Sequence, residues 1–449
     1  MTDLPNGWEW VTLEELGVGA QPGFASGKHN RDKRGITHLR PMNVSRLGLI
    51  DTSDVRYVVD DSTRRVQADD VLFNNTNSPA LVGKTALVTS RTPLAYSNHM
   101  TRLRPSKGVV SAFLARQLHW LWTRGYFRDV LSHHVNQASV SSQVLLQTRI
   151  AIPGTAEQRR VVAALERYLP RAQSAATSLR AACMKIDFLV GSARQELTMM
   201  FADGMQPLGN LLIDIEAGRS FVAEGRPAEV DEWGIIKVSA MTWGEFRQDE
   251  NKAVPCDREI DVRHEIKTGD ILISRANTEK YVGAAVLVRG TRPKLLLSDK
   301  SLRLIPKQSV DPVWLTEVLA SPAVRSQISA RATGMKDSMR NISQKALREI
   351  RAPSATSKQQ AQVVEALSDL RIETSRLRSQ VEAAERRQDL LRESLLRDAF
   401  AGRLVSQDSN DEPASVLLER IKAERTARPK ARRGRLSTKR TNPVQEGML

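Results

Sequence analysis

The chain has 449 residues, of which 41% are hydrophobic and 26% charged, so it is long enough to bury two or three domain cores. Its formal net charge of +16 indicates a polyanionic partner such as nucleic acid. No apolar run is long enough to cross a bilayer, and residues 1–10 lack the basic start and apolar core of a signal peptide, so we expect a cytoplasmic protein with no membrane partner.

Residues 1–154 form a first expected domain with alternating strand and helix signals. A short apolar strand with polar residues after it is expected in ADDVLFNNTNS at residues 68–78, and an alternating strand in SNHMTRLRP at residues 97–105. An apolar helical stretch at residues 112–127 and a polar loop, SHHVNQAS, at residues 132–139 follow. The domain ends at Pro153, immediately before a long helical pattern.

The same order of elements returns in residues 206–354, about 200 residues later. The corresponding segments are TGDILISRANT at residues 268–278, SDKSLRLIP at residues 298–306, a helical stretch at residues 313–328 and ATGMKDSMRN at residues 332–341. A repeat of this period is a whole domain rather than one turn of a solenoid. The sequence therefore predicts a tandem duplication of one mixed α/β domain.

Each repeat leads into a long helical pattern, at residues 155–205 and 355–404. Each helix would contain about 45 residues and measure about 65 Å. Apolar residues recur at gaps of three and four, as in a coiled coil, and the predicted seam includes Val161, Leu165, Leu179, Ile186 and Leu189 in the first helix, and Val363, Leu367, Leu377, Val381 and Leu391 in the second. Two independent helices would satisfy this pattern, but the duplication around them favours one antiparallel pair. Pro170 should kink the first helix or delay its regular start.

A C-terminal segment, residues 405–449, carries much of the basic charge. Ten basic and only two acidic residues fall between Glu419 and Arg440, which amounts to half the net charge of the chain. We expect residues 426–449 to form a disordered, solvated tail. The remainder of the chain is still basic. The two cysteines, Cys183 and Cys256, form no CxxC motif, which fits a reducing cytoplasm and argues against a structural zinc site.

Together these segments resemble the specificity subunits of type I restriction-modification systems. The features that carry the resemblance are the GDIL strand at residues 269–272 with its degenerate copy at 69–72, the two long helices entered after a proline, and residues 395–424, LLRDAFAGRLVSQDSNDEPASVLLERIKAE. The resemblance extends to about Arg425. No single motif is specific, but the order of all of them is.

The resemblance implies a fold class, partners and a division of labour. It implies a mixed α+β fold with two target-recognition domains that read the two halves of a split, asymmetric site on double-stranded DNA. Two long antiparallel coiled-coil helices would separate these domains and set the spacer. Two methyltransferase subunits, which methylate adenine at N6 with S-adenosylmethionine, and two motor-nuclease subunits would be partners. ATP and Mg²⁺ would bind those partners, and this chain would hold no cofactor and catalyse nothing.

Motifs for catalysis are weak in this sequence. It has no (D/N/S)PP(Y/F) motif, which an amino-methyltransferase needs to hold its target nitrogen, and the nearest match is Asn442-Pro443-Val444. GFASGKH at residues 23–29 is one residue short of a phosphate loop. Glu265 and Lys267, with Asp257 or Asp261, form a possible nuclease set, but a solvated turn before a strand explains them better. A metal site at His99, His133 and His134 lacks a clustered cysteine or acid ligand, so polar loop contacts are the better interpretation.

The candidate DNA contacts are polar and basic residues in loops at equivalent points of the two repeats. Arg and Lys read guanine, Asn and Gln read adenine, and all of these also bind phosphates. In the first domain the candidates are Lys28, Asn30, Arg31, Lys33, Arg34, Asn74, Asn75, Asn77, His133, His134, Asn136 and Gln137. In the second they are Arg219, Lys237, Arg275, Asn277, Lys280, Lys336, Arg340 and Asn341.

A second class of function stays open at this point. The chain could be a coiled-coil scaffold whose globular domains bind proteins rather than DNA. Sequence-specific DNA binding by the purified complex separates the two hypotheses. Whether such a system restricts DNA or only methylates it does not follow from this sequence.

Overall fold

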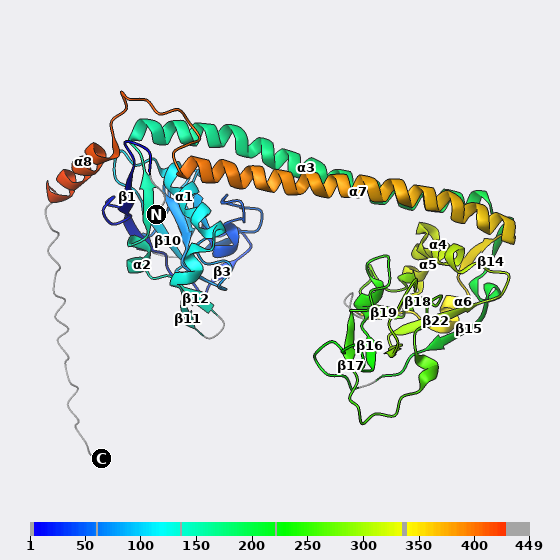
Figure 1. The fold of residues 1–449 in the computed structure, drawn as a ribbon. Coiled ribbons are helices and arrows are strands. Elements are labelled where there is room, and N and C mark those ends of the chain that lie inside the picture. The colour runs from blue at the N-terminus through cyan, green and yellow to red at the C-terminus, as the bar shows by residue number, and fades with distance from the viewer. Residues whose placement is uncertain (1–3, 60–61, 135–136, 221, 335–338, 428–449) are drawn as a thin grey trace, which may run out of the picture. The chain divides into compact units, whose positions relative to one another are not determined.

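The computed structural model describes residues 4–59, 62–134, 137–220, 222–334 and 339–427 (Figure 1). The chain divides into two compact units, the first comprising residues 1–175 and 387–449 and the second residues 176–386. The fold is a mixture of helices and strands, with one similar domain in each unit and two long helices that contribute to both. This is the predicted fold class.

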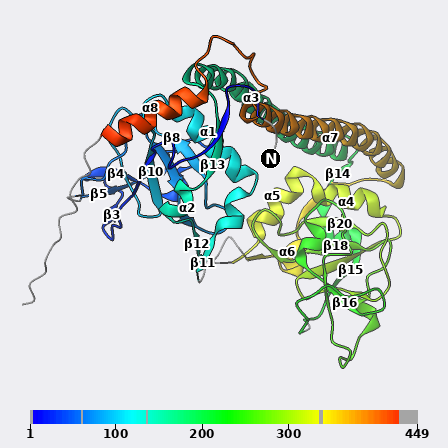
Figure 2. The ribbon, with the colours of Figure 1, turned by 60° about the vertical axis from the view of Figure 1, so that its left-hand side comes forward.

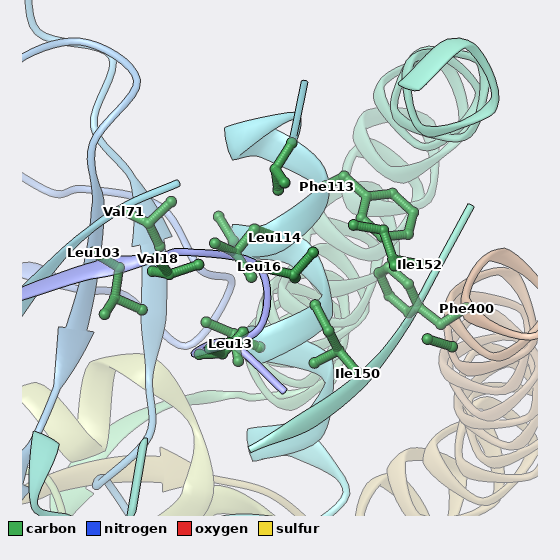
Figure 3. Close-up of a cluster of buried hydrophobic side chains, with 14 of the residues drawn as sticks. Leu13, Leu16, Val18, Val71, Leu103, Phe113, Leu114, Ile150, Ile152 and Phe400 are labelled. Carbon is green, nitrogen blue, oxygen red and sulfur yellow. The ribbon is translucent and has the colours of Figure 1, made fainter. Parts of the chain in front are cut away.

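The first unit is built on an antiparallel four-stranded sheet in the order β2-β10-β6-β8. Its strands are β2 (Gly19–Pro22), β10 (Met100–Arg104), β6 (Val71–Asn74) and β8 (Thr85–Leu87). Every residue of β6 is buried, as expected for an apolar run in a central strand. Helix α1 (Ser111–Thr123) packs against β6 and β8. Figure 3 shows Leu114 of this helix near Leu16 and Val18, and Phe113 beside Ile152 and Phe400.

Smaller sheets surround this core. One has the order β3-β5-β4-β9, another β11-β12-β7, and a third pairs β1 with β13. Their bounds are β1 (Glu9–Thr12), β3 (His29–Asn30), β4 (Ile36–Leu39), β5 (Arg56–Val58), β7 (Thr76–Asn77), β9 (Ala95–Tyr96), β11 (Ser132–His134), β12 (Gln137–Ser139) and β13 (Arg149–Ile152). The short helix α2 (Ser142–Leu146) starts at Ser141, whose side chain accepts a hydrogen bond from the Val144 amide.

The second unit repeats this arrangement with the sheet order β15-β22-β18-β20. The strands are β14 (Gly204–Pro207), β15 (Leu212–Ala217), β16 (Gly234–Ile236), β17 (Asn251–Ala253), β18 (Ile271–Ser274), β19 (Ala276–Asn277), β20 (Ala285–Leu287), β21 (Leu295–Leu296), β22 (Ser301–Pro306), β23 (Arg340–Asn341) and β24 (Arg351–Ser354). The helices are α4 (Pro312–Ala320), α5 (Pro322–Arg331) and α6 (Gln344–Arg348). Short 3₁₀ turns in the two units are η1 (Pro41–Asn43), η2 (Tyr126–Val130), η3 (Leu208–Leu211), η4 (Val238–Met241) and η5 (Val262–His264).

A buried glutamine at the start of each long helix makes the duplication visible in detail. Gln158 accepts a hydrogen bond from the Val110 amide at 2.8 Å and donates to the Pro153 carbonyl at 2.9 Å. Gln360 makes the equivalent pair of bonds in the second unit, with the Asp311 amide at 2.7 Å and the Ala355 carbonyl at 2.9 Å. Each long helix is therefore tied to its own domain by the same side-chain contact.

The long helices are α3 (Thr155–Met200) and α7 (Ser357–Phe400), and they pack together side by side (Figures 1 and 2). The start of α3 and the end of α7 lie in the first unit, while the end of α3 and the start of α7 lie in the second, so the pair is antiparallel. In the second unit Arg378 of α7 pairs with Asp187 of α3. Helix α3 is not interrupted at Pro170, so the proline does not delay the start of the helix.

The predicted seam is only partly buried. Val161, Leu165, Val363 and Leu367 are buried in the domain cores, whereas Leu179, Ile186 and Val381 are half-buried. Three residues of the predicted seam, Leu189, Leu377 and Leu391, are exposed, which corrects that prediction.

The error at Leu189 has a local cause. Residue 190 is also apolar, and the half-buried aliphatic side chains after Ile186 are those of Val190, Ala193 and Leu197. The predicted seam is therefore wrong at Leu189, where the neighbouring Val190 is the less exposed residue, because an α-helix turns every 3.6 residues rather than every 3.5.

The C-terminal segment begins with an ordered helix on the first unit. Helix α8 (Ala414–Ala427) buries Ala414, Leu417 and Ile421 against the core of that unit. Arg425 donates a hydrogen bond to the Glu14 carbonyl at 2.6 Å. Residues 428–449, which contain most of the predicted disordered tail, lie outside the described residues.

The buried carboxylate of Glu317 links the second domain to both long helices. Glu317 in α4 is almost fully buried, accepts a hydrogen bond from Arg194 Nε of α3 at 2.7 Å, and pairs with Arg371 of α7. We expect Glu317→Ala to lower the free energy of unfolding by about 3 kcal/mol, because it leaves two arginines without their shared partner.

Urea unfolding measures this loss. The matched control is Glu382→Ala, since Glu382 lies exposed on α7 and pairs with Arg386 only at 4.0 Å. This control should change stability by less than about 0.5 kcal/mol. Equal effects of the two substitutions would contradict the structural role of Glu317.

Candidate nucleic-acid interface

One tight turn in each unit organises the polar clusters. In the first unit the turn at residues 97–99 precedes β10, and the His99 carbonyl accepts hydrogen bonds from the amides of Asn75 at 3.1 Å and Thr76 at 3.3 Å. In the second unit the turn at residues 298–300 precedes β22, and the Lys300 carbonyl accepts from Arg275 at 2.9 Å and Ala276 at 3.3 Å. The backbone hydrogen bonds between this turn and the residues after the central strand are therefore the same in both repeats, and we call this arrangement the backbone frame.

Two further backbone contacts extend this equivalence. The Asn98 amide donates to the Phe24 carbonyl at 3.0 Å, and the Asp299 amide donates to the Arg219 carbonyl at 3.1 Å. The glycines before these residues, Gly23 and Gly218, pass so close to the turn that an added Cβ would meet a carbonyl oxygen at 2.2 and 2.3 Å. These backbone contacts align Phe24 with Arg219, Asn75 with Arg275, and His99 with Lys300.

The three asparagines after β6 differ in their surroundings. Asn74 is fully buried and donates to the Pro41 carbonyl at 2.9 Å, so in this conformation it supports the loop and is not available to a ligand. Asn75 is half-buried and donates to the Asn98 carbonyl at 3.3 Å. The Asn77 side chain accepts a hydrogen bond from the Ser78 amide at 2.7 Å, which forms a tight local turn.

The hairpin of β11 and β12 lies beside these residues, because β12 pairs with β7 and brings Ala138 opposite Asn77. His133 and Gln137 are exposed on this hairpin, and His134 belongs to its first strand. Asn136 lies outside the described residues. The hairpin and the end of β6 therefore form one polar surface of the first unit.

The basic loop at residues 28–34 is closed by Asn30. This side chain donates to the carbonyls of Arg34 at 3.0 Å and Tyr57 at 3.1 Å, and accepts from the Arg34 amide at 3.1 Å. Arg34 pairs with Asp32 at 2.9 Å. Lys28, Arg31 and Lys33 are exposed, so they are the residues of this loop that can reach a ligand.

In the second unit a groove of about 440 Å³ lies beside the turn at residues 298–300. Its lining includes Lys237, Lys252 and Lys300, and Arg219 adjoins it through the bridge to Ser298. Lys237 Nζ lies 3.7 Å from a carboxylate oxygen of Glu250. Lysines lining a groove provide the charge that a nucleic-acid backbone requires.

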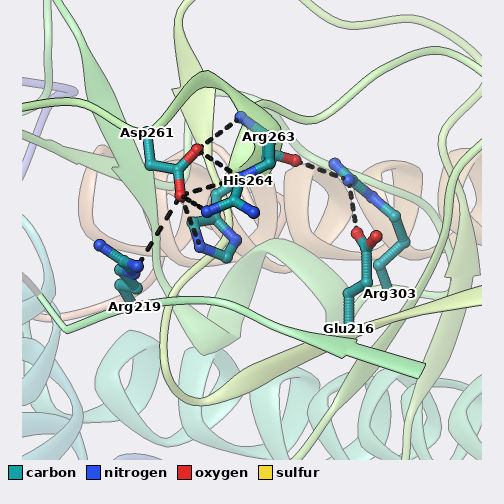
Figure 4. A network of polar contacts seen from close by, with 6 residues as sticks. All are labelled: Glu216, Arg219, Asp261, Arg263, His264 and Arg303. Carbon is teal, nitrogen blue, oxygen red and sulfur yellow. Dashed lines mark hydrogen bonds and ion pairs between the residues drawn. The ribbon is translucent and has the colours of Figure 1, made fainter. Parts of the chain in front are cut away.

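Arg219 reaches the edge of a polar network shown in Figure 4. Its guanidinium lies 3.8 Å from a carboxylate oxygen of Asp261, which also accepts a hydrogen bond from Arg263 Nη2 at 2.7 Å. The hydrogen bonds from Arg263 hold the pKa of Asp261 well below its usual range, so this carboxylate stays ionised at neutral pH. Arg219 is thus only partly neutralised and remains exposed.

The remaining candidates of the second unit lie around β19 and β23. The Asn277 side chain accepts a hydrogen bond from the Thr278 amide at 2.8 Å, as Asn77 does from Ser78 in the first unit. Asn277 also lies opposite Arg340 in the pairing of β19 with β23. Lys280 is exposed above the Tyr281 ring, and Asn341 is exposed on β23. Lys336 lies outside the described residues.

The sequence prediction missed Lys252 and Lys300. The signal for Lys300 was present, because SNH at residues 97–99 and SDK at residues 298–300 open equivalent strands, which aligns Lys300 with His99. Lys252 carries no comparable signal, since an isolated lysine in a short strand reads as a surface residue.

The weak catalytic motifs have structural explanations in the described residues. Residues 23–29 lead into strand β3 and not into the helix that a phosphate loop requires. Glu265 accepts a hydrogen bond from the Lys294 amide at 2.7 Å, and the Asp261 carboxylate is bound to Arg263. Among the described residues no three His, Cys, Asp or Glu side chains come together as a metal site, and no helix is long and apolar enough to span a membrane.

Comparisons with known proteins place these features in context. No family model matches the chain. The chain is 29% identical over 190 residues to the specificity subunit of the type I restriction enzyme EcoEI from Escherichia coli, a match that spans 42% of this chain and only 32% of that relative. It is 24% identical over 416 residues to the EcoKI specificity subunit of Escherichia coli strain K12, which covers 87% of this chain and 88% of the relative.

A solved structure from work on the complex assembly and conformational transition of the type I restriction-modification system shares the fold. It has a TM-score of 0.68 and 19% identity, and the match covers 90% of this chain and all of the other. The homologues of the chain are thus specificity subunits of type I restriction enzymes. The resemblance predicted from the sequence is confirmed.

Proposed function

We propose that the chain is the DNA-specificity subunit of a type I restriction-modification complex and acts in the cytoplasm. Each of its two domains contacts one half of a bipartite, asymmetric site on double-stranded DNA. The observation that carries the proposal is the similarity to the EcoKI specificity subunit along nearly the whole of both chains. The duplicated turns support it, because each domain presents polar side chains of different chemistry on the same backbone frame.

The long helices offer a surface for the partner subunits. Met184 and Phe188 of α3, four residues apart and therefore on one face, are 66% and 73% exposed. Two exposed large apolar side chains on one face of a helix offer a surface that the apolar side of a partner helix can cover. We assign this face to the docking of a methyltransferase subunit, and the complete complex would hold two methyltransferase subunits and two motor-nuclease subunits.

The chain itself takes no part in the chemistry under this proposal. S-adenosylmethionine, ATP and Mg²⁺ bind the partner subunits. The role of this chain is to hold the DNA so that a target adenine reaches the methyltransferase. The non-catalytic role of the chain rests on its similarity to specificity subunits.

A methyl-transfer assay tests this division of labour. The purified chain with labelled S-adenosylmethionine and DNA should incorporate no label, and adding the partner methyltransferase should start incorporation at adenine N6. The methyltransferase alone is the matched control and should modify DNA weakly and without a defined site. Incorporation by this chain alone would contradict the proposal.

The alternative, a coiled-coil scaffold whose domains bind only proteins, is not favoured by the comparisons. It predicts no preference of the assembled complex for any DNA sequence. Binding of the complex to random duplexes at several salt concentrations separates the scaffold hypothesis from the specificity-subunit hypothesis. Phosphate contacts weaken as salt rises, so a sequence preference that persists at high salt supports a specificity subunit.

A further inference from the structure

Arg275 is unusual among the arginines of the second unit. The residue is half-buried, and its guanidinium has no hydrogen bond or ion pair with the described residues. Arg303, by contrast, pairs with Glu216 at 3.0 Å and Asp270 at 2.9 Å, and Arg226 pairs with Glu232 at 2.6 Å. The N–H donors of Arg275 are not used by the described residues and are therefore free to bind a ligand.

Lys300 is a second free cation next to Arg275. The two residues are joined by the 2.9 Å hydrogen bond between the Arg275 amide and the Lys300 carbonyl. Lys300 is exposed, lines the basic groove of about 440 Å³, and has no ion pair within the described ranges. Asp299 also lines this groove, but neither cation forms an ion pair with it, so both side chains can bind an electron-rich ligand.

The equivalent positions of the first unit carry different chemistry. Asn75 and His99 occupy the same backbone frame, as the matching hydrogen bonds to the two turns show. They supply an amide and an imidazole where the second unit supplies a guanidinium and an ammonium. Different side chains on the same backbone frame are what two domains that read different base sequences require.

We infer that Arg275 and Lys300 determine specificity for one half-site by contacting the O6 and N7 acceptors of guanine. The inference rests on the proposed function and goes further, because it assigns a base to named residues. An arginine that reaches into the major groove can donate two hydrogen bonds to the O6 and N7 acceptors of one guanine, which a phosphate contact does not require. Asn75 and His99 hold the corresponding positions for the other half-site, so the two halves differ in sequence.

Methylation of a library of random DNA duplexes by the reconstituted complex tests this inference. With Arg275→Ala, one half-site should lose its preference for guanine at one position by roughly 5- to 150-fold, which corresponds to about 1–3 kcal/mol. The other half-site should not change. Arg275→Lys should restore the preference only in part, because lysine lacks the two-pronged donor geometry.

A matched control comes from the two ends of strand β22. Lys300 directly precedes this strand and Lys307 directly follows it, about 20 Å away at the rise of an extended chain. Lys300→Ala should relax the same half-site as Arg275→Ala, whereas Lys307→Ala should leave both half-sites intact. Thermal unfolding and co-elution with the methyltransferase establish that each variant folds and assembles.

Three results would overturn the inference. Uniform weakening on all sequences would make Arg275 a phosphate contact, an unchanged site would place it away from the DNA, and changes in both half-sites would exclude a domain-specific role. Failure of the proposed function has a different signature, because the wild-type complex would then methylate no bipartite site at all.

Discussion

The double substitution Met184→Glu and Phe188→Glu should abolish recruitment of the methyltransferase. Both side chains are more than three-fifths exposed in the free chain, so the substitutions remove little from its own packing. Burial of such a side chain in an interface contributes about 1.5–3 kcal/mol. Two charges placed there should therefore weaken the complex by at least about 100-fold.

Analytical gel filtration and methyl transfer measure this loss together. Lys185→Glu, with Arg180→Glu added, changes the net charge by more than the double substitution does, at exposed positions of the same helix. This control should keep both assembly and activity if the apolar face is the contact. Loss of assembly in both variants would mean that the charge of α3 matters and its apolar residues do not.

Insertion of one heptad into each long helix should lengthen the spacer between the two half-sites. The ion pair between Asp187 and Arg378 marks matched positions for the insertions. Seven residues lengthen a helix by about 10 Å. Since DNA rises about 3.4 Å per base pair, the spacer should grow by about three base pairs while the half-site sequences stay the same.

Activity of the lengthened variant should fall. Three base pairs also rotate the second half-site by about a third of a turn, which the added heptad does not fully compensate. A single heptad inserted into α3 alone is the control and should disrupt the antiparallel pairing. Sequencing of methylated DNA gives the spacer length, and an unchanged spacer with full activity would show that the helices do not set it.

The fold was largely predictable because its strongest signals are local and occur twice. Buried strands such as β6 and β18 are apolar runs followed by polar turns, and the long helices show apolar residues at regular spacing. The seam could not be placed where two apolar residues are adjacent, as at Leu189 and Val190, because either register satisfies the pattern.

The candidate site was less predictable because burial and pairing depend on residues far apart in sequence. Asn74 and Asn75 are neighbours with the same side chain, yet Asn74 is fully buried and hydrogen-bonded to the Pro41 carbonyl, whereas Asn75 is half-buried. The chain contains many acids that could have paired with Arg275, and only the fold shows that none of the described ones does. The sequence repeat alone aligns Lys300 with His99. Only the structure shows that the two residues make the same backbone hydrogen bonds.

Sequencing of the adenines methylated by the reconstituted wild-type complex tests the central claim most directly. Two domains that each read half of a site predict one asymmetric sequence, with two fixed half-sites of different composition separated by a spacer of constant length and free sequence. A contiguous recognition sequence, two identical half-sites, or methylation without sequence preference would contradict the assignment of one DNA-reading domain to each unit.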